Sequence, residues 1–451
     1  MHNLRSIADV AHLMLSPVNH VSREDRATMR NAGTVVRTLL PSILVLTAIL
    51  GSVSTPATAD SRHGGFKTPL VIGHRGGATG YLPDHTLENY ALGVELGADF
   101  IEPDLVMTRD GHLIARHEPN IKTTTDVASH PEFASRRRTA IVDGAEDEGW
   151  FASDFTLAEI KTLRAIQPLA ERPQQFNGRF QIPTLQEVIA LAKRKSQEKG
   201  RTIGIYPEIK HSTYHKSIGL PIESPLVRIL RAAGLDHRDA PVFIQSFEQS
   251  NLKELRRMTR VRLVQLIDAN DVNPDGSLDF TAPFDRPYDW TASGDPQLLA
   301  RTFGFFVTDA GLREVATYAD GIGPWKRYIV STSAVDLNQD GTVGDENGDG
   351  NTDEADRALS PPTNLVRRAH ARGLLVPYVD IPQRGQASGR RLCRQSGERI
   401  SSVLSARRRW GVRRLRGHCR RGAPCSSCLV IRTSRAACLV GGDDHFGSRC
   451  R

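Results

Sequence analysis

The chain has 451 residues, with 59 Lys and Arg against 51 Asp and Glu, for a formal net charge of +8 at pH 7. This length allows two or three ordinary domains, or one large α/β barrel with insertions. Hydrophobic residues make up 39% and charged residues 24% of the chain. Such a composition excludes a disordered chain, a fibrous chain and a multi-span membrane protein.

The positive charge is concentrated in the C-terminal tail. Residues 384–451 hold 17 Arg, no Lys and three acidic residues, an excess of 14 positive charges that leaves the other 383 residues at a net −6. All six cysteines lie in the same tail. The whole-chain charge would favour a nucleic-acid partner, but the mildly acidic, cysteine-free body does not, and we expect no such partner.

The N-terminal segment has the order of parts found in a secretory signal peptide. Arg30 precedes an apolar run over residues 39–50, and Ala-Thr-Ala follows at residues 57–59. This order directs export, and the run is too short for a confident membrane span; a short buried helix is the alternative. We expect residues 1–59 to be a leader, with the signal peptide at about 29–59. The mature protein is then periplasmic or secreted, without an integral membrane span.

The tail over residues 384–451 has no sustained helical or strand pattern. Its abrupt switch to Arg, Cys and Ser with loss of Lys is typical of translation in a shifted reading frame. Two alternatives stay open. Cys425 and Cys428 could form half of a zinc site, although no second pair has matching spacing. The Arg runs could also bind nucleic acid or an anionic surface. We expect a tail that is disordered or frameshifted.

Between these ends, short apolar runs alternate with stretches of helical periodicity. The expected strands are residues 69–73, 98–101, 202–206, 241–244, 261–267 and 374–379. The expected helices are residues 86–96, 184–195, 222–233, 249–258 and 364–371. Strands that alternate with helices predict βα units and a parallel sheet. In a (β/α)₈ barrel of such units, the chemistry lies at the C-terminal ends of the strands.

Three carboxylates lie at these predicted strand ends. Glu102 and Asp104 are two positions apart on a strand, so both side chains point to the same face, and Glu208 ends the next strand. Together they form an all-oxygen donor set that suits Ca²⁺ or Mg²⁺ rather than zinc. For any one of the acids, a salt bridge to a neighbouring Lys or Arg is the alternative.

Two histidines and two cations lie beside the carboxylates in the same pattern. His74 and His117 suit acid–base work on an anionic substrate, in which one removes a proton and the other protonates the leaving group. Arg75 and Lys210 supply positive charge for a phosphate. The body contains no Gly-x-Ser-x-Gly motif, no P-loop and no cysteine that could act as a nucleophile.

The motifs around these residues resemble those of glycerophosphodiester phosphodiesterases, particularly the exported bacterial periplasmic type. The matching segments follow one another from about residue 70 to residue 379, and include residues 74–76, 97–111, 117–118 and 206–210. The resemblance implies an α/β fold, a TIM-type (β/α)₈ barrel of the PLC-like phosphodiesterase class over residues 60–383, with an insertion at about residues 119–179. It also implies metal-dependent hydrolysis of glycerophosphodiesters to sn-glycerol 3-phosphate and an alcohol.

The same resemblance assigns roles to individual residues. His74 and His117 become the general base and acid pair, and Arg75 and Lys210 contact the substrate phosphate. The three carboxylates become ligands of Ca²⁺, with Mg²⁺ as the alternative ion. Which histidine is the base first stays open, as does the choice between water and the substrate's own hydroxyl as the attacking group.

The chain departs from this family at its C-terminal end. The seventh strand of the family normally ends in a His-Pro-Tyr type motif, whereas residues 375–379 read Leu-Val-Pro-Tyr-Val. The Arg-rich tail stands where the eighth strand would follow, so we expect the last strand to be missing or replaced. A smaller departure is Glu118, where the family usually has Asp. Two alternatives follow: another lipid phosphodiesterase, phospholipase D-like, on the same barrel, or a non-catalytic truncated remnant.

An acidic segment over residues 336–356 carries a separate pattern. Residues 345–356 place oxygen-bearing side chains at positions 1, 3, 5, 9 and 12 of a Ca²⁺ loop, with Gly at position 6. The candidate ligands are Asp345, Asn347, Asp349, Asp353 and Asp356. We expect a structural Ca²⁺ here that would staple the loop between barrel strands; a solvated acidic loop is the alternative.

Overall fold

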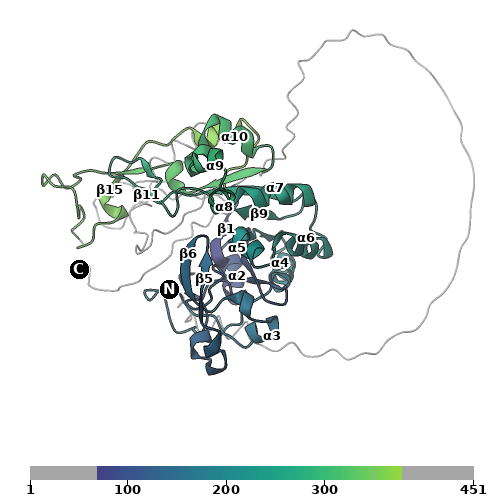
Figure 1. Cartoon of the computed structure of the whole chain (residues 1–451). Helices are drawn as coiled ribbons and strands as arrows, with labels where there is room; N and C mark the ends of the chain where they lie inside the picture. The colour runs from purple at the N-terminus through teal and green to yellow at the C-terminus, as the bar shows by residue number, and fades with distance from the viewer. Residues whose placement is uncertain (1–68, 349, 378–451) are drawn as a thin grey trace, which may run out of the picture. The chain divides into compact units, whose positions relative to one another are not determined.

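The computed structural model describes residues 69–348 and 350–377. Several predictions concern residues outside these ranges and stay predictions. They are the leader with its signal peptide, the Arg-rich tail, the last two residues of the strand expected over 374–379, and Asp349. The helices and strands of the described residues are drawn in Figure 1.

Short parallel strands form the centre of the fold and pair in the order in which they occur along the chain. The first three are β1 (Ile72–Gly73), β2 (Phe100–Ile101) and β7 (Gly204–Ile205). The strands β2 and β7 continue as β3 (Asp104–Met107) and β8 (Glu208–Ile209). Pro103 and Pro207 separate the halves, because proline has no N–H to donate to a neighbouring strand. The order then runs through β9 (Phe243–Ser246), β10 (Arg262–Ile267) and β13 (Gly321–Pro324).

A parallel bridge between Gly321 and Leu375 adds a seventh chain segment to this order. Consecutive parallel strands with helices between them are the architecture of a TIM-type barrel, so the α/β barrel predicted from the sequence is confirmed. Within the described residues no pairing joins Leu375 back to β1. The missing or replaced eighth strand remains a prediction, because the chain that would supply it lies beyond residue 377.

The strand β13 was not among the expected strands, because Gly-Ile-Gly-Pro has neither length nor an apolar run. Its glycines allow close approach of the neighbouring strands. A Cβ at Gly321 would lie 2.9 Å from the Leu375 carbonyl oxygen, and one at Gly323 would lie 2.7 Å from Leu266 Cδ2. The residues that weaken the strand pattern are therefore the ones that let three segments pack here.

The five predicted helices are present. They are α2 (Leu87–Glu95), α4 (Leu185–Lys199), α6 (Glu223–Ala232), α7 (Gln249–Met258) and α11 (Leu365–His370). The helix α4 runs four residues beyond its predicted end, to a left-handed Gly200. Among the described residues, five further helices of four to seven residues were not predicted: α3 (Leu157–Ile160), α5 (Ser212–Ser217), α8 (Tyr288–Ser293), α9 (Pro296–Leu299) and α10 (Asp309–Val315).

The remaining elements are antiparallel strands and 3₁₀ turns outside the central sheet. The strand β4 (Leu113–Ala115) pairs antiparallel with β3. Two small hairpins are β11 (Asp271–Val272) with β12 (Leu278–Asp279), and β14 (Thr332–Ala334) with β15 (Arg357–Leu359). The 3₁₀ turns are η1 (His74–Gly76), η2 (Val127–Ser129), η3 (Pro131–Arg136), η4 (Ala152–Asp154), η5 (Phe303–Val307), η6 (Lys326–Tyr328) and η7 (Glu354–Asp356).

The segment after β4, where the insertion is expected, has a hairpin and a core of its own. The strands β5 (Arg138–Val142) and β6 (Ala145–Gly149) lie side by side in Figure 1 and pair along their full length. Their turn is Asp143-Gly144, with φ angles of 48° and 81°, the two-residue turn that matches the twist of a hairpin. Phe133 and Phe155 pack edge to face in the small core below it.

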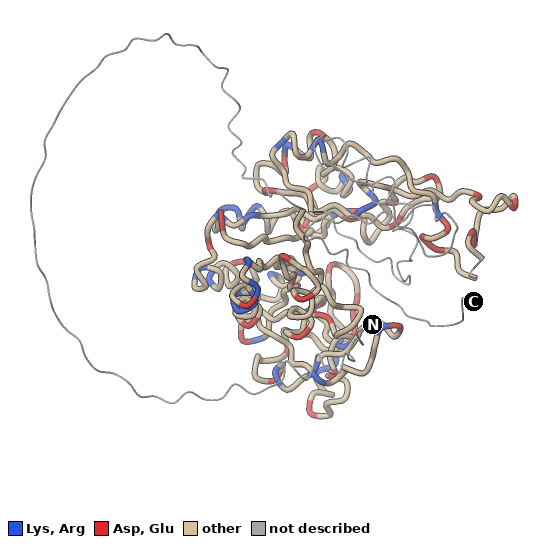
Figure 2. The backbone as a smooth tube through the Cα atoms, turned by 180° about the vertical axis from the view of Figure 1, so that it is seen from behind, with Lys and Arg blue, Asp and Glu red and all other residues tan. Residues whose placement is uncertain are grey.

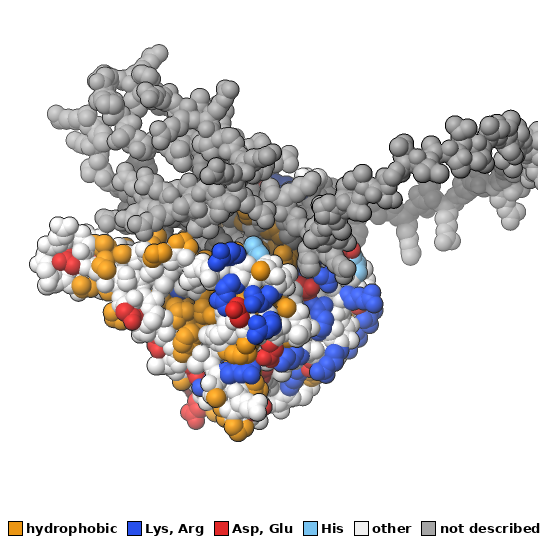
Figure 3. Space-filling model, turned by 90° about the horizontal axis from the view of Figure 1, so that it is seen from above, with side chains coloured by type: hydrophobic (Ala, Val, Ile, Leu, Met, Phe, Trp, Pro, Cys, Tyr) orange, Lys and Arg blue, Asp and Glu red, His pale blue; other side chains and the backbone are white. Residues whose placement is uncertain are grey.

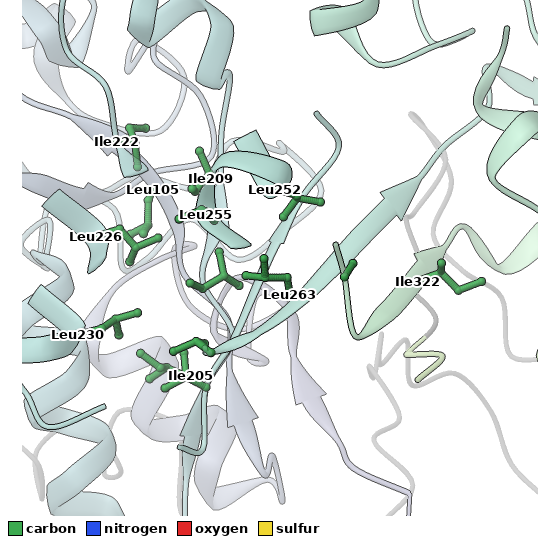
Figure 4. Close-up of a cluster of buried hydrophobic side chains, with 14 of the residues drawn as sticks. Leu105, Ile205, Ile209, Ile222, Leu226, Leu230, Leu252, Leu255, Leu263 and Ile322 are labelled. Atoms are coloured by element: carbon green, nitrogen blue, oxygen red, sulfur yellow. The ribbon is translucent and has the colours of Figure 1, made fainter. Parts of the chain in front are cut away.

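The main hydrophobic core lies between the central strands and the helices α6 and α7. Leu226 and Leu230 of α6 and Leu255 of α7 are fully buried, as is Leu263 of β10 (Figure 4). Burying a Leu side chain stabilises the folded state by about 1.5–3 kcal/mol. The central strands, and the polar side chains at their ends, are therefore held by packing on the outside of the sheet.

Replacing Leu255 by Ala is expected to lower the free energy of unfolding by about 2–5 kcal/mol, because the change removes buried methyl groups and leaves a cavity. Leu337→Ala is the matched control, since Leu337 is 46% exposed and surface substitutions change stability by about 0.5 kcal/mol or less. Urea unfolding followed by circular dichroism measures both. Equal effects of the two substitutions would contradict the core described here.

The surface of the described residues carries both signs of charge. Lys and Arg alternate with Asp and Glu along the backbone trace of Figure 2. The face seen in Figure 3 presents a group of basic side chains with acidic ones among them. None of the described helices is both long and apolar enough to cross a bilayer.

A buried histidine makes stability sensitive to acid. His215 of α5 is fully buried, and neither ring nitrogen has a hydrogen-bond partner within the described residues. Burial, with the nearby charge of His211, lowers the pKa of His215 to about 3. An unfolded histidine has a pKa of about 6.5, so the unfolded chain binds more protons between pH 3 and 6.5.

Stability is therefore expected to fall as the pH drops from about 6.5 towards 3, by at most about 1.4 kcal/mol per pH unit from this residue. Urea unfolding at a series of pH values measures the slope. His215→Leu should flatten it, whereas His237→Leu, at an exposed position, should not. A slope that is unchanged in His215→Leu would contradict the assignment.

Candidate functional site

Three buried carboxylates meet where β2 passes into β3 and where β7 passes into β8. Glu102 follows β2, Asp104 opens β3 and Glu208 opens β8. Asp104 and Glu208 are register partners in the β3–β8 pair. One oxygen from each of the three side chains lies within 4.8 Å of the others. The sheet thus brings Glu208 beside Glu102 and Asp104, which lie more than one hundred positions earlier in the sequence.

Hydrogen bonds from neighbouring side chains fix these carboxylates. Gln245 Nε2 donates to Glu102 Oε1 at 3.1 Å and to Glu208 Oε2 at 3.2 Å. His85 Nε2 lies 2.9 Å from Asp104 Oδ2, and its Nδ1 lies 2.9 Å from the Tyr90 hydroxyl. Asp104 Oδ1 is buried without a hydrogen-bond partner in the described structure. A buried oxygen of this kind is costly unless a cation or donor meets it.

The electrostatics of the carboxylates indicate a need for added positive charge. Burial raises the pKa of Glu102 well above its usual range, and the charges of Asp104 and Glu208 raise it further. Burial also raises the pKa of Glu208 to about 7. Burial alone would raise the pKa of Asp104, but the charge and hydrogen bond of His85 outweigh it and hold this pKa well below its usual range.

A hard divalent cation fits this donor set. All the donors are carboxylate oxygens, the type that Ca²⁺ and Mg²⁺ prefer, and the buried Asp104 Oδ1 is left for a ligand bond. The residues that would hold the ion are the same three that the sequence pattern singles out.

Two cations and a histidine face the carboxylates. The ring nitrogen Nε2 of His117 lies 2.6 Å from Arg75 Nη2 and 3.4 Å from Lys210 Nζ. Lys210 also donates to Glu208 Oε1 at 2.9 Å. Both groups next to Nε2 are donors only, so Nε2 is the acceptor and carries the lone pair. His117 is therefore in the form that can take up a proton.

The loop after β1 supplies Arg75 in a strained conformation. Its φ angle is +51°, a region that costs a non-glycine residue about 1–3 kcal/mol and is common at functional sites. The Arg75 N–H donates to Glu102 Oε2 at 2.6 Å, and the Arg75 carbonyl accepts from the His85 N–H. These bonds hold the guanidinium beside His117 and the neighbouring His74.

Both predicted catalytic histidines are neutral at pH 7. Burial lowers the pKa of His74 well below its usual range, and the charges of Arg75 and His117 contribute. Burial, with the charges of Lys210 and Arg75, lowers the pKa of His117 to about 4. A bound phosphodiester anion would offset the two cations and make protonation of either imidazole easier.

All seven site residues named from the sequence, the two histidines, two cations and three carboxylates, lie in this region. Four residues that hold them in place were not among the predicted site residues: His85 and Gln245, which contact the carboxylates, and Glu118 and His211, which contact each other. The sequence signal for His85 is its place directly before Thr86, the residue that caps helix α2. Gln245 could have been found as a polar residue near the C-terminal end of β9, directly before its last residue Ser246.

The acidic segment forms a separate loop. Asp345 accepts from the N–H groups of Gly348 and Gly350 at 2.8 and 2.7 Å. Asp356 Oδ1 accepts from the Asn347 N–H at 3.1 Å, and Asp353 caps η7 through the Ala355 N–H. The carboxylates thus fold the loop on itself. Because Asp349 lies outside the described residues, a Ca²⁺ ion held by this loop stays a prediction.

Comparison with known proteins gives consistent matches. A family model described as the glycerophosphoryl diester phosphodiesterase family matches residues 74–379. The chain is 33% identical over 362 residues to a glycerophosphodiester phosphodiesterase of Arabidopsis thaliana, covering 76% of this chain and 84% of that protein. It is 30% identical over 281 residues to a glycerophosphodiester phosphodiesterase of Haemophilus influenzae, covering 58% and 70%.

Solved structures to which the chain is similar include an Oleispira antarctica phosphodiesterase in complex with the product sn-glycerol-3-phosphate. Its sequence identity is 18% and its TM-score 0.39, over 70% of this chain and 94% of that chain. A glycerophosphodiester phosphodiesterase of Thermotoga maritima is similar at 14% identity and a TM-score of 0.37, and the match covers 76% of this chain and 100% of that chain.

Proposed function

The chain belongs to the glycerophosphoryl diester phosphodiesterase family, and on this premise we propose that it hydrolyses glycerophosphodiesters to sn-glycerol 3-phosphate and an alcohol. The observation that carries the proposal is the site itself. Three buried carboxylates within 4.8 Å of one another lie beside His117, whose Nε2 faces Arg75 and Lys210. This combination can neutralise a phosphodiester and move a proton at it.

The metal ligands in this proposal are Glu102, Asp104 and Glu208, and the ion is Ca²⁺, with Mg²⁺ as the alternative. When bound, such an ion draws charge off the phosphoryl oxygens as the ester bond breaks. Gln245 and His85 keep the ligands in place through the hydrogen bonds already described. Removing an outer-shell partner of this kind typically lowers metal affinity or activity by about 10–100-fold.

The chain's own groups then divide the remaining work. The Arg75 guanidinium and the Lys210 ammonium bind non-bridging phosphate oxygens by charge-assisted hydrogen bonds. His117 accepts a proton at Nε2 from the attacking hydroxyl group. His74 takes up a proton from solvent once the phosphodiester anion offsets the two cations, and gives that proton to the oxygen of the departing alcohol. A buried site of this kind strengthens each of these interactions, because little water screens them.

Export is a further part of the proposal. The basic region, apolar run and Ala-Thr-Ala site over residues 29–59 support a signal peptide, and we infer that the protein is periplasmic or secreted. Cell fractionation followed by N-terminal sequencing tests this. Exported protein that begins near Asp60 is expected, whereas material that stays in the cytoplasm with its leader intact would overturn the inference.

A substrate panel tests the activity. The purified full-length chain is incubated with Ca²⁺ and either glycerophosphocholine or lysophosphatidylcholine, and sn-glycerol 3-phosphate is measured by a coupled dehydrogenase assay. Release from glycerophosphocholine is expected. Choline release from lysophosphatidylcholine alone would favour a phospholipase D-like enzyme, and a folded chain that turns over neither substrate would favour a non-catalytic remnant.

A further inference from the structure

A line of close polar contacts begins at Nδ1 of His117, the ring nitrogen that does not face Arg75 and Lys210. His117 Nδ1 lies 2.6 Å from Glu118 Oε1. The other oxygen of that carboxylate, Oε2, lies 2.9 Å from His211 Nε2, and His211 Nδ1 lies 2.7 Å from Asp143 Oδ2. Two carboxylates and a second imidazole thus stand in line behind the ring whose Nε2 faces Arg75 and Lys210.

Three separate segments build this line. Glu118 follows β4, and His211 follows β8 with a left-handed φ of 49°. Asp143 is the first turn residue of the β5–β6 hairpin. At the second turn residue, a Cβ on Gly144 would lie 3.2 Å from the Tyr288 ring at the start of α8. The hairpin tip is therefore packed in place next to His211.

The charges along the line are ordered. The hydrogen bonds to Asp143 and Glu118 outweigh burial and raise the pKa of His211 to about 10, so its imidazolium donates to both carboxylates at neutral pH. Interactions with His117 and His211 outweigh burial and hold the pKa of Glu118 well below its usual range. Glu118 is then a carboxylate that accepts from both rings, and the His117 proton stays on Nδ1.

This arrangement decides what His117 can do. A neutral imidazole carries one proton, and the hydrogen bond at one nitrogen sets which tautomer is present. With Nδ1–H donated to Glu118, the lone pair is left on Nε2, the atom that faces the site. When Nε2 takes a proton, the Glu118 carboxylate stabilises the imidazolium. The charge already on His211 keeps the Nδ1 proton from moving to Glu118.

We propose that His211, anchored by Asp143 at the tip of the β5–β6 hairpin, is a positioning residue that acts through Glu118 to fix the tautomer and ring orientation of His117. The inference rests on the proposed function, and it gives the insertion hairpin a part in the proton transfer. Within the described residues, no side-chain hydrogen bond or ion pair joins His211 or Asp143 to Arg75, to Lys210 or to the three candidate metal ligands.

The first test is the kinetics of His211→Ala with glycerophosphocholine. We expect kcat to fall by about 10–100-fold, the range known for outer-shell partners of metal-ligating histidines, with KM changed by less than about threefold. The acid limb of the kcat profile should move to higher pH, because the loss of a nearby positive charge favours protonated His117. His237→Ala, at an exposed histidine, is the matched control and should leave kcat, KM and the acid limb of the kcat profile unchanged.

Two further variants separate positioning from folding. Asp143→Asn keeps a residue that tolerates the left-handed turn but loses a negative charge. It should lower kcat by about 3–10-fold and move the acid limb to lower pH, opposite to His211→Ala, because protonated His117 is then less favoured. His211→Arg keeps a cation with several donors and should recover part of the kcat lost in His211→Ala. Wild-type kcat in both His211→Ala and Asp143→Asn would overturn the proposal, as would a loss of kcat with an unmoved acid limb.

The NMR spectrum of the histidine rings gives a readout that does not depend on turnover. In ¹⁵N-labelled wild-type protein, His117 should show a protonated Nδ1 and an unprotonated Nε2 at pH 7, and His211→Ala should show a mixture of tautomers. An unchanged tautomer in folded His211→Ala overturns the positioning role even if the protein hydrolyses the substrate. Wild-type protein with the expected tautomer but no turnover would instead count against the proposed function alone.

Discussion

Replacing His117 by Ala is expected to lower kcat/KM for glycerophosphocholine by about 10²–10⁴-fold, the contribution typical of a positioned general base. The reason lies in the geometry of its ring. Nε2 carries the lone pair and lies 2.6 Å from Arg75 Nη2, one of the two cations that we propose bind the phosphate. Burial and the two cations lower the pKa of His117 to about 4, so the ring is unprotonated throughout the neutral range. Initial rates over a range of substrate concentrations measure the effect.

His112→Ala is the control for this substitution. The His112 side chain is 44% exposed, and its ring lies 3.9 Å from Asp110, so its removal should leave kcat/KM within about twofold of wild type, as expected of a surface change. A His117→Ala protein that is folded by circular dichroism and retains wild-type kcat/KM would show that another group takes the proton.

Replacing Asp104 by Asn is expected to abolish at least about 99% of the activity, because even outer-shell partners of metal ligands contribute about 10–100-fold. Asn keeps the shape of the side chain but removes the charge, and Asp104 Oδ1 is the buried oxygen without a hydrogen-bond partner. EDTA should bring wild-type protein to the same low rate, and added Ca²⁺ or Mg²⁺ should restore wild-type protein but not Asp104→Asn.

Glu146→Gln serves as the matched control for Asp104→Asn. Glu146 lies on the outer face of the β5–β6 hairpin and is exposed, so loss of its charge should not change activity or its response to EDTA. Wild-type protein that keeps its rate in EDTA after dialysis would contradict a metal-assisted reaction. The ion that restores activity at the lowest concentration would decide between Ca²⁺ and Mg²⁺.

The sequence predicted the parts of the site that depend on local spacing. Glu102 and Asp104 share a face because strand side chains alternate, and Glu208 joins them because parallel strands end at the same edge of the sheet. The helices α2, α4, α6 and α7, which have nine to fifteen residues, followed from periodicity in the same way, as did the six-residue α11. Short helices such as α5 and the glycine-rich strand β13 were not predicted, because a few residues carry too little pattern.

Contacts between distant segments could not be read from spacing. His211 lies 93 residues from Glu118 and 68 from Asp143. In the sequence, His211 looks like a polar residue after a strand, and Asp143 looks like an ordinary Asp-Gly turn. Only the path of the insertion hairpin brings them together. Residues that position catalytic groups are in general less visible than the groups themselves, because their chemistry is not specific to the reaction.

The most direct test of the proposed activity is a ³¹P NMR time course of the full-length wild-type protein with glycerophosphocholine and Ca²⁺. The proposal predicts that the phosphodiester signal is replaced by that of sn-glycerol 3-phosphate, and that EDTA stops the change. Persistence of the phosphodiester in the presence of folded protein would contradict it. So would conversion to phosphocholine, because the bond on the other side of the phosphorus would then be the one that breaks.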